Sequence, residues 1–265
     1  MTALLEVSGL HKSFAGVRAV DGISFAVEAG TITGLIGPNG SGKTTTIDCI
    51  SGFQRLDRGR IMLAGTEIAG APPQRVARAG LMRTFQTVQL YDHLSLIDNL
   101  TIAAQQFDAA GFIDEFFRTR EYREAAAAAS ERARELIALI GLSRYSEAEA
   151  SIFSYGQKKL IALAAALMPR PKLLVLDEPV AGVNPTRIRE IEAILRRFNE
   201  AGETFLIVEH NVEFITNLCH RVIVLDQGLK LAEGSAAEIH TDPRVLEAYL
   251  GMTPEMAAAE MRGAA

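Results

Sequence analysis

The chain has 265 residues, 48% of them hydrophobic and 22% charged, so it is neither a disordered segment nor a fibrous protein. Its length allows one large domain or two small ones. The formal net charge of −5 argues against a protein that binds nucleic acid by neutralising phosphates. The apolar runs are far shorter than the ~20 residues of a membrane span, and we expect no secretory signal. With only Cys49 and Cys219, a disulfide scaffold is excluded and a reducing cytosol is favoured.

The first part of the chain is predicted to begin with β-structure. Residues 4–10 and 22–27 alternate apolar and polar side chains, which predicts two antiparallel strands. Residues 32–36 form an apolar strand that stops at a glycine-rich stretch. A helix is expected from Thr45 to Ser51, and a further short strand at residues 60–63.

The rest of the chain is predicted to alternate helices with buried strands. Residues 99–144 read as mainly helical, and the alanine run at 125–129 has the highest helix propensity. Such alternation predicts an α/β fold with a mostly parallel sheet covered on both faces. Residues 251–265 are expected to form a frayed tail. The other expected elements are helices within 70–84 and at 157–168, 188–199 and 212–218, and strands at 173–176, 204–208, 221–225 and 229–232.

The glycine-rich stretch carries the strongest chemical signal. Residues 37–44 read GPNGSGKT and fit the P-loop pattern G-x-x-x-x-G-K-[ST]. Glycines let consecutive backbone N–H groups surround phosphates, and the helix that follows presents its positive end to the same anion. Lys43 would reach the β and γ phosphates, and Thr44 would hold Mg²⁺. The composition predicts about 0.004 chance matches in this length, so an ordinary glycine turn is disfavoured.

A second signal is the apolar strand that ends in acidic residues at LLVLDEP, residues 173–179. This is the Walker B pattern, in which Asp177 would support Mg²⁺ through water. Glu178 would then polarise the attacking water as a general base. Because apolar strands often end in an acid, this pattern gains its weight from the P-loop.

The stretch FSYGQ at residues 153–157 precedes Asp177 by about twenty residues. With it, the chain resembles the ATP-binding-cassette (ABC) ATPases, whose signature reads LSGGQ or LSYGQ. The resemblance covers about residues 4–250, and the motifs occur in the family's order. Two positions depart from the usual pattern. Phe153 replaces a leucine, and Asn184 stands where many members have aspartate.

The resemblance implies roles for residues that would mean little singly. Phe14 takes the adenine-stacking position, Gln86 in RTFQ the Q-loop position and His210 in VEHN that of the switch histidine. Alone, they would be read as a core phenylalanine, a solvated loop residue and a core histidine, while Glu209 is interpreted as structural. The implied catalytic residues are Glu178, His210 and Gln86; the magnesium ligands are Thr44, Gln86 and Asp177; the ATP contacts are Phe14, Asn39, Gly40, Ser41, Gly42, Lys43, Thr44, Thr45, Ser154, Gly156 and Gln157.

The resemblance also implies a P-loop NTPase fold of the ABC type, as a single domain over residues 1–250. A core lobe (about 1–86 and 158–240) would hold the parallel sheet and an antiparallel β subdomain, and a helical subdomain (about 87–157) would be inserted in it. Two such subunits would bind ATP head to tail, each supplying Ser154, Gly156 and Gln157 to the other's site. Asn184 would lie at their interface, and hydrolysis would let the pair open. Whether the working pair is homodimeric or mixed stays open.

Because no membrane span is predicted, a transport role would need two permease subunits. In the resembled family a short permease helix enters a groove, here near residues 86–91 and 95–150. The aromatic residues around 112–117 would border that groove or pack inside the subdomain. RTFQ, FSYGQ, AGVNP, VEHN and a terminal AYLG together resemble the larger ATPase of branched-chain amino acid importers. That likeness implies a periplasmic substrate-binding protein and a peripheral place at the cytoplasmic face of the inner membrane.

Three alternatives remain at this stage. The same scaffold serves importers of urea, short amides or aromatic acids, because the cassette does not touch the substrate. A soluble ABC ATPase acting on DNA or ribosomes usually carries a long coiled coil or two cassettes, and this sequence shows neither. A P-loop kinase would lack the signature and His210.

Overall fold

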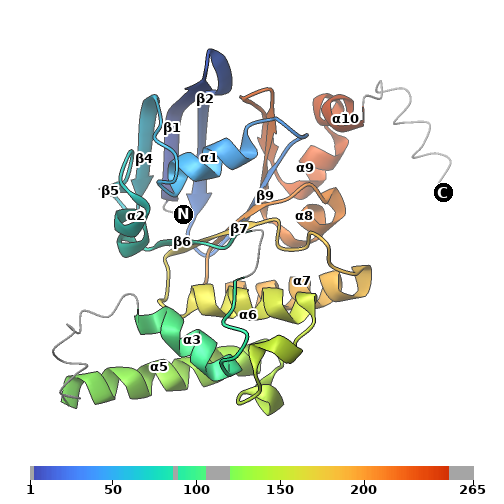
Figure 1. The fold of residues 1–265 in the computed structure, drawn as a ribbon. Coiled ribbons are helices and arrows are strands. Elements are labelled where there is room, and N and C mark those ends of the chain that lie inside the picture. Colours follow the sequence, from blue (N-terminus) through green and yellow to red (C-terminus); the bar gives the residue numbers. More distant parts are fainter. Residues whose placement is uncertain (1–2, 86–88, 106–119, 251–265) are drawn as a thin grey trace. The chain divides into compact units, whose positions relative to one another are not determined.

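The computed structural model describes residues 3–85, 89–105 and 120–250. The chain divides into two compact units, and Figure 1 shows the elements of each. The larger unit comprises Met1–Arg83, Lys172–Pro179 and Phe198–Ala265, and the smaller unit comprises Thr84–Pro171 and Val180–Arg197. Among the described residues, no helix is long and apolar enough to serve as a membrane span. Cys49 and Cys219 are both buried and form no disulfide.

The larger unit contains an antiparallel sheet in which the strands follow the order β2-β1-β4-β5. Residues Ala15 and Gly16 both have positive φ and form the two-residue turn that returns β1 into β2, with Phe14 opposite Val17. Alternate side chains of β1 face the core, where Leu5, Val7 and Leu10 are buried. The strands are β1 (Ala3–Phe14), β2 (Val17–Glu28), β4 (Arg58–Leu63) and β5 (Thr66–Glu67).

A second sheet of the larger unit has six strands in the order β10-β9-β3-β8-β7-β6. The five strands from β9 to β6 run parallel to one another, and β10 is antiparallel to its neighbour β9. The central strands are buried along their length because helices cover both faces of such a sheet. The strands are β3 (Ile32–Ile36), β6 (Leu81–Arg83), β7 (Leu173–Asp177), β8 (Phe205–Val208), β9 (Arg221–Asp226) and β10 (Leu229–Gly234).

Strand register brings three chain segments to one edge of this sheet. Val208 at the end of β8 lies opposite both Leu35 of β3 and Asp177 of β7. The residues that follow these three strands therefore meet at the carboxyl edge, which is where open parallel sheets bind ligands.

The helices of the larger unit pack their apolar sides onto the sheets. Ile47 and Ile50 of α1 are fully buried in the core cluster. Gly34 lets α8 approach β3 closely, since a Cβ there would lie 2.9 Å from the Ile215 side chain. The helices are α1 (Lys43–Ile50), α2 (Pro73–Ala79), α8 (Val212–Leu218), α9 (Ala236–Thr241) and α10 (Pro243–Leu250).

The smaller unit is helical. Its helix α3 packs against both α5 and α6, and these also touch each other. The predicted alanine-rich helix is confirmed, as α5 runs without interruption through residues 125–129. The helices are α3 (Leu96–Gln105), α5 (Arg120–Leu139), α6 (Tyr155–Leu167) and α7 (Pro185–Glu200), whose last residues belong to the larger unit, with 3-10 turns at Ser143–Tyr145 and Ala150–Ile152.

The fold class predicted from sequence is confirmed: a mostly parallel sheet, an antiparallel β region and a helical unit. The smaller unit also includes α6 and most of α7, whereas the sequence placed residues from 158 onward in the core lobe. Helix α6 packs on α3 and α5. Among the strands and α-helices, β5, β6, α9 and α10 escaped prediction. The aromatic residues at 112–117 and the tail 251–265 lie outside the described residues.

Candidate functional site

The predicted P-loop lies between β3 and α1 in a conformation that needs glycine. Gly37 and Gly42 both have φ in the left-handed range, at +156° and +99°. A Cβ on Gly37 would lie 2.2 Å from the Leu225 carbonyl oxygen, and one on Gly42 would lie 2.5 Å from that of Ala19. Neither carbonyl can move without disturbing a strand, so side chains are excluded at both positions. The glycines of the pattern are therefore required by backbone geometry.

The side chains of Lys43 and Ser41 can bind an anion at this loop. Lys43 donates from Nζ to the carbonyl oxygens of Gly37 and Pro38, at 2.7 and 2.9 Å. Burial lowers the pKa of Lys43, and the carboxylates of Glu178 and Asp177 partly oppose that shift. The Ser41 hydroxyl is buried and has no hydrogen-bond partner within the described part of the chain. An unsatisfied buried hydroxyl calls for a ligand atom, which a phosphate oxygen would supply.

Asp177 ends strand β7, and its side chain is mostly buried. Its Oδ2 accepts a hydrogen bond from Nη2 of Arg83 at 2.8 Å. Arg83 ends the neighbouring strand β6 and was not singled out from the sequence. A charged residue at the end of an apolar strand, three positions before Gln86, is the signal that could have found it.

Glu178, next along the chain, has φ +48°, a left-handed conformation that is strained for glutamate. Its backbone N–H donates to the carbonyl oxygen of Val208 at 2.9 Å, which fixes it to the end of β8. Its Oε1 lies 3.8 Å from Nδ1 of His210. The His210 side chain is 60% exposed, so the imidazole can reach a ligand.

Glu209 holds the turn that carries His210. Its carboxylate is fully buried, and Oε2 accepts hydrogen bonds from the backbone N–H groups of His210 and Asn211, at 3.0 and 3.3 Å. The same oxygen lies 3.7 Å from the His210 Nδ1. This structural role agrees with the interpretation from sequence.

The carboxyl edge of the six-stranded sheet thus brings together Lys43, Asp177, Glu178 and His210. The pairing of β3, β8 and β7 brings the ends of these strands together, and His210 contacts Glu178. Both carboxylates also oppose the lowering of the Lys43 pKa. A cation, two carboxylates and an imidazole beside backbone N–H groups can bind a phosphate chain, hold a divalent cation and move a proton. Thr44, Asn39 and Gly40 are exposed, and Thr45 is partly buried. Gln86 lies outside the described residues.

Phe14 ends β1, and its side chain is 44% exposed. The Nζ of Lys12 lies 5.1 Å from the centroid of its ring and is anchored by Asp57 at 3.2 Å. An aromatic ring at this exposure is accessible to a planar ligand, and a core role for Phe14 is excluded.

The predicted signature lies in the smaller unit at the start of α6. Ser154 is the N-cap, where its Oγ accepts from the backbone N–H of Gln157 and the Gln157 Oε1 accepts from the N–H of Ser154. Phe153 is buried and packs edge-to-face on Tyr145, so the smaller unit accommodates the exchange of leucine for phenylalanine. Asn184 is exposed, and its Oδ1 accepts from the Thr186 N–H at the start of α7.

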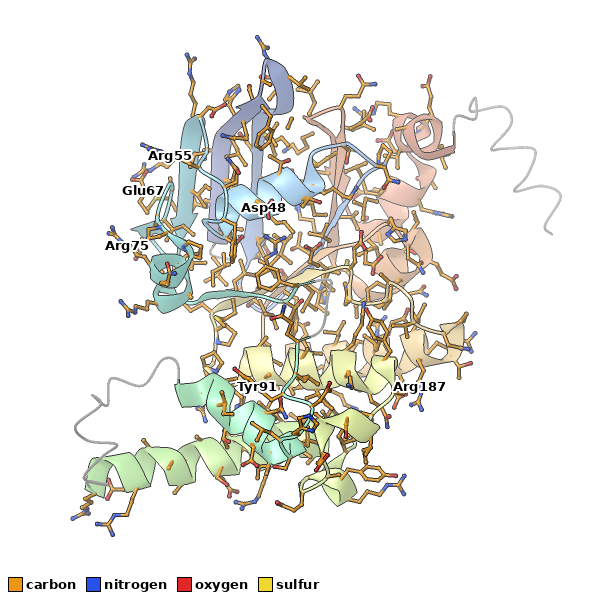
Figure 2. All side chains as sticks on the ribbon, in the orientation of Figure 1. Asp48, Arg55, Glu67, Arg75, Tyr91 and Arg187 are labelled. Carbon is orange, nitrogen blue, oxygen red and sulfur yellow. The ribbon has the colours of Figure 1, made fainter. Side chains whose placement is uncertain are left out.

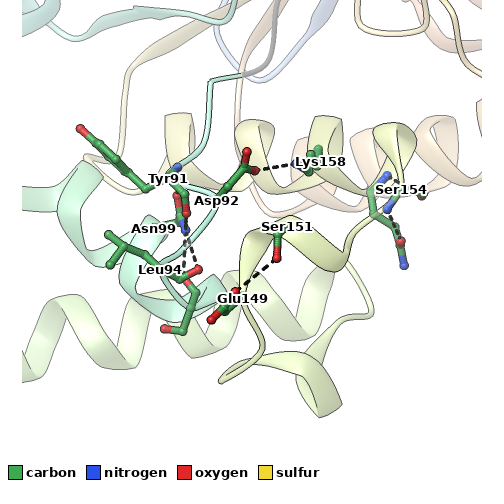
Figure 3. Close-up of polar contacts among 10 residues, drawn as sticks. Tyr91, Asp92, Leu94, Asn99, Glu149, Ser151, Ser154 and Lys158 are labelled. Carbon is green, nitrogen blue, oxygen red and sulfur yellow. Dashed lines mark hydrogen bonds and ion pairs between the residues drawn. The ribbon is translucent and has the colours of Figure 1, made fainter.

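A pocket of about 650 Å³ lies in the smaller unit. Its lining comes from the segment that begins at Gln89 and from α3 and α6, and includes Tyr91, Asp92, Asn99, Ile102, Lys158 and Ala165. Asn99 fixes the segment by accepting from the Tyr91 N–H and donating to the Tyr91 and Leu94 carbonyls (Figure 3). Lys158 of α6 pairs with Asp92 at 2.6 Å, and its hydrogen bond lowers the pKa of the Asp92 carboxyl.

Comparison with known proteins places these features in one family. Residues 20–181 match the family model for "ABC transporter", and residues 230–251 match the one for "Branched-chain amino acid ATP-binding cassette transporter". The high-affinity branched-chain amino acid transport ATP-binding proteins BraF of Pseudomonas aeruginosa and LivG of Escherichia coli are 36% and 35% identical to this chain. Both alignments cover 94% of the chain and 98% of the relative.

Solved structures of ABC transporter cassettes have a similar fold. The ADP conformation of MJ1267, an ATP-binding cassette of an ABC transporter, superposes with a TM-score of 0.82 and 32% identity. The match covers 95% of this chain and all of that one. The cbiO1 subunit from Clostridium perfringens, at 23% identity and a TM-score of 0.78, shares the fold.

Proposed function

The chain belongs to the ATP-binding proteins of ABC transporters, in the branched-chain amino acid transport family, and from that premise we propose how its residues work and what its transporter carries. The subunit hydrolyses ATP to drive transport. The roles of the residues rest on one observation. At the ends of three adjacent parallel strands, the chain places together Lys43, Asp177, Glu178 and His210.

Binding of ATP uses the P-loop. Lys43 leaves the carbonyl oxygens of Gly37 and Pro38 for the β and γ phosphates, and the Ser41 hydroxyl gains the partner it lacks. The phosphates receive the N–H groups at the start of α1, and the adenine stacks on Phe14. The loop residues Asn39, Gly40, Gly42 and Thr45 surround the phosphate chain.

Magnesium fits the oxygen donors at this edge, since it prefers hydroxyl and carboxylate ligands. Thr44 and Asp177 would hold it, with Gln86 as a third candidate outside the described residues. When bound, the ion neutralises charge on the β and γ phosphates. Asp177 offers Oδ1, because Arg83 occupies its Oδ2.

Hydrolysis uses the pair Glu178 and His210. The Glu178 carboxylate accepts a proton from water as that water attacks the γ phosphorus, and the bond to the bridging oxygen breaks. His210 turns one ring nitrogen toward Glu178 and Glu209. Its other nitrogen donates to the γ phosphate, where charge grows in the transition state.

A second ATPase subunit completes each site. The N-terminal end of α6, with Ser154, Gly156 and Gln157, would cap the γ phosphate of the partner's nucleotide. Asn184, exposed at the start of α7, would lie at that interface. The capping box of Ser154 and Gln157 keeps this helix end ordered before a partner arrives.

The pocket of the smaller unit would receive a short helix of a permease subunit. It borders the segment that follows Gln86, so an occupant would touch the chain next to the nucleotide-sensing position. Its lining mixes apolar residues such as Ile102 and Ala165 with the Asp92–Lys158 pair. An amphipathic helix can cover both kinds of surface.

We assign branched-chain amino acids as the cargo of the transporter, from the names of the relatives and the match over residues 230–251. Two permeases and a periplasmic substrate-binding protein complete the importer, and the ATPase lies peripherally at the cytoplasmic face of the inner membrane. The test is uptake of labelled leucine, isoleucine and valine by cells that produce Glu178→Gln in place of the natural subunit. Uptake of urea, short amides and aromatic acids is followed in parallel.

Loss of branched-chain amino acid uptake alone supports the assignment. Loss of urea, amide or aromatic acid uptake with intact leucine uptake replaces the substrate. Unchanged uptake of all of them overturns the transport assignment for these compounds.

A further inference from the structure

The guanidinium of Arg83 joins two acidic residues that come from different parts of the larger unit. Its Nη2 donates to Asp177 Oδ2 at 2.8 Å, and its Nη1 donates to Asp48 Oδ1 at 2.5 Å and to Ser51 Oγ at 3.2 Å. The Arg83 side chain is 7% exposed, and the Phe53 ring lies 5.8 Å away. Asp48 projects from α1 (Figure 2).

This bridge links the two elements that flank the proposed nucleotide site, helix α1 and strand β7. Helix α1 begins at Lys43, directly after the P-loop, and carries Asp48 in its middle. Strand β7 carries Asp177, and β6 pairs with it in parallel so that Arg83 lies opposite Val175. One rigid, planar cation therefore ties the helix of the phosphate loop to the strand of the metal-binding carboxylate.

The geometry determines what the bridge does to Asp177. Because Oδ2 is held by Arg83, the carboxylate cannot rotate freely, and Oδ1 keeps a constant direction. Partners that orient a metal ligand in this way tune metal affinity, since the ligand loses little freedom when the ion binds.

We propose that Arg83 is a positioning residue for magnesium: it fixes the Asp177 carboxylate relative to α1 and thereby sets the affinity of the nucleotide site for the metal. The proposal rests on the role of Asp177 given above. It assigns to Arg83 no contact with ATP or with the attacking water. A lysine would keep the charge but lose the two-armed geometry, since an ammonium cannot form this planar fork.

The test measures ADP binding to the purified full chain by calorimetry, once with saturating Mg²⁺ and once with excess EDTA. For Arg83→Lys, we expect the gain in ADP affinity that Mg²⁺ provides to fall about tenfold or more, with the affinity in EDTA unchanged. Asp48→Asn leaves Arg83 and Asp177 in place but loosens the other arm, so a smaller loss in the same direction is expected. Asp48 is partly exposed, so this variant should fold even if Arg83→Lys does not.

Two controls separate the outcomes. Arg221→Lys disrupts another arginine–carboxylate pair of the same unit, at 2.8 Å to Glu233, and should leave both affinities unchanged. Asp177→Asn tests the underlying role and should lose the magnesium gain. If Asp177→Asn loses it while Arg83→Lys and Asp48→Asn keep it, the role of Arg83 is wrong. If Asp177→Asn also keeps it, the magnesium role of Asp177 is wrong. If Arg83→Lys loses the same amount of ADP affinity with magnesium and with EDTA, the bridge only stabilises the fold, and the proposal is overturned.

Discussion

Glu178 and His210 face each other at the ends of two adjacent parallel strands, with 3.8 Å between the carboxylate Oε1 and the imidazole Nδ1. Two backbone features hold this pair. The N–H of Glu178 donates to Val208 on the neighbouring strand, and the N–H of His210 donates to buried Glu209. A carboxylate held in this way beside an imidazole is ready to accept a proton from water, while the imidazole meets the charge that develops on phosphate.

The first prediction concerns the general base. Glu178→Gln should bind ATP with normal affinity but hydrolyse it about a hundredfold or more slowly, because an amide cannot accept the proton of the attacking water. Phosphate release by the purified subunit measures this, with nucleotide affinity measured separately. Glu213→Gln, an exposed acid on α8, is the matched control and should hydrolyse at the normal rate. Full turnover in Glu178→Gln would assign the base elsewhere.

A second prediction follows from the backbone of Glu178. With φ at +48°, a side chain at this position costs about 1 kcal/mol relative to glycine. Both Glu178→Gly and Glu178→Ala should lose turnover, but the glycine variant should be more stable than the alanine variant by about 1 kcal/mol. Urea unfolding of the two variants measures the difference. Equal stabilities would show that the backbone at this position is not strained.

Local sequence patterns predicted the strands and the helix that surround the candidate site. The strand before the P-loop, the helix after it and the strand that ends at Asp177 each depend on a short run of residues. An apolar run, a glycine pattern and a terminal acid are visible without knowledge of the rest of the chain. The same is true of α8, whose predicted bounds match the structure.

Features that depend on distant partners could not be predicted in this way. Strand β6 has only three residues, and its existence depends on pairing with β7, some ninety positions later. Arg83 gains its meaning from Asp177, 94 positions away. The strained φ of Glu178 depends on the end of β8. By contrast, α9 has a local signal, since Ser235 and Glu238 form a capping box that the sequence displays.

Ser154 offers a third prediction, because it serves both as a helix cap and as a proposed contact to the partner's nucleotide. Ser154→Ala should lose about 1 kcal/mol of stability, as N-cap serines do, and should also lose ATP turnover. Ser235→Ala is the matched control, since it removes the same kind of capping box from α9. It should lose similar stability and keep turnover. Thermal unfolding and phosphate release measure both effects. If both variants keep full turnover, the proposed contact of Ser154 with the partner's nucleotide is wrong.

A fourth prediction concerns the charge of Lys43. Burial lowers the pKa of Lys43 in the folded chain below the ordinary value of 10.5. A protonated Lys43 therefore destabilises the folded state. Between the lowered pKa and 10.5 the unfolded chain binds more protons than the folded chain. The free energy of unfolding therefore increases as pH rises through this range. Relative to Lys43→Met, the natural protein should become more stable as pH rises through this range. Urea unfolding of both proteins at several alkaline pH values measures the difference, and a gap that widens in the opposite sense would contradict the burial effect.

The same variant tests nucleotide binding. ATP should raise the melting temperature of the natural protein and leave that of Lys43→Met unchanged, because a ligand stabilises only the state that binds it. Lys12→Met, at a lysine beside Phe14, is the control for loss of a lysine near the site. It should keep most of the ATP-induced shift. A normal shift in Lys43→Met would remove Lys43 from the phosphate site.

The last prediction addresses the pocket of the smaller unit. Ala103 lines this pocket on α3, and a tryptophan there would occupy part of the space that we assign to a permease helix. Ala103→Trp should therefore keep ATP turnover as an isolated subunit but lose association with the membrane subunits. The control is Ala127→Trp, which places the same side chain at an exposed position of α5. Retention of the ATPase on washed membranes measures association. If Ala103→Trp stays bound as well as Ala127→Trp, the permease helix docks elsewhere, because a helix packed closely into this pocket would clash with the added indole.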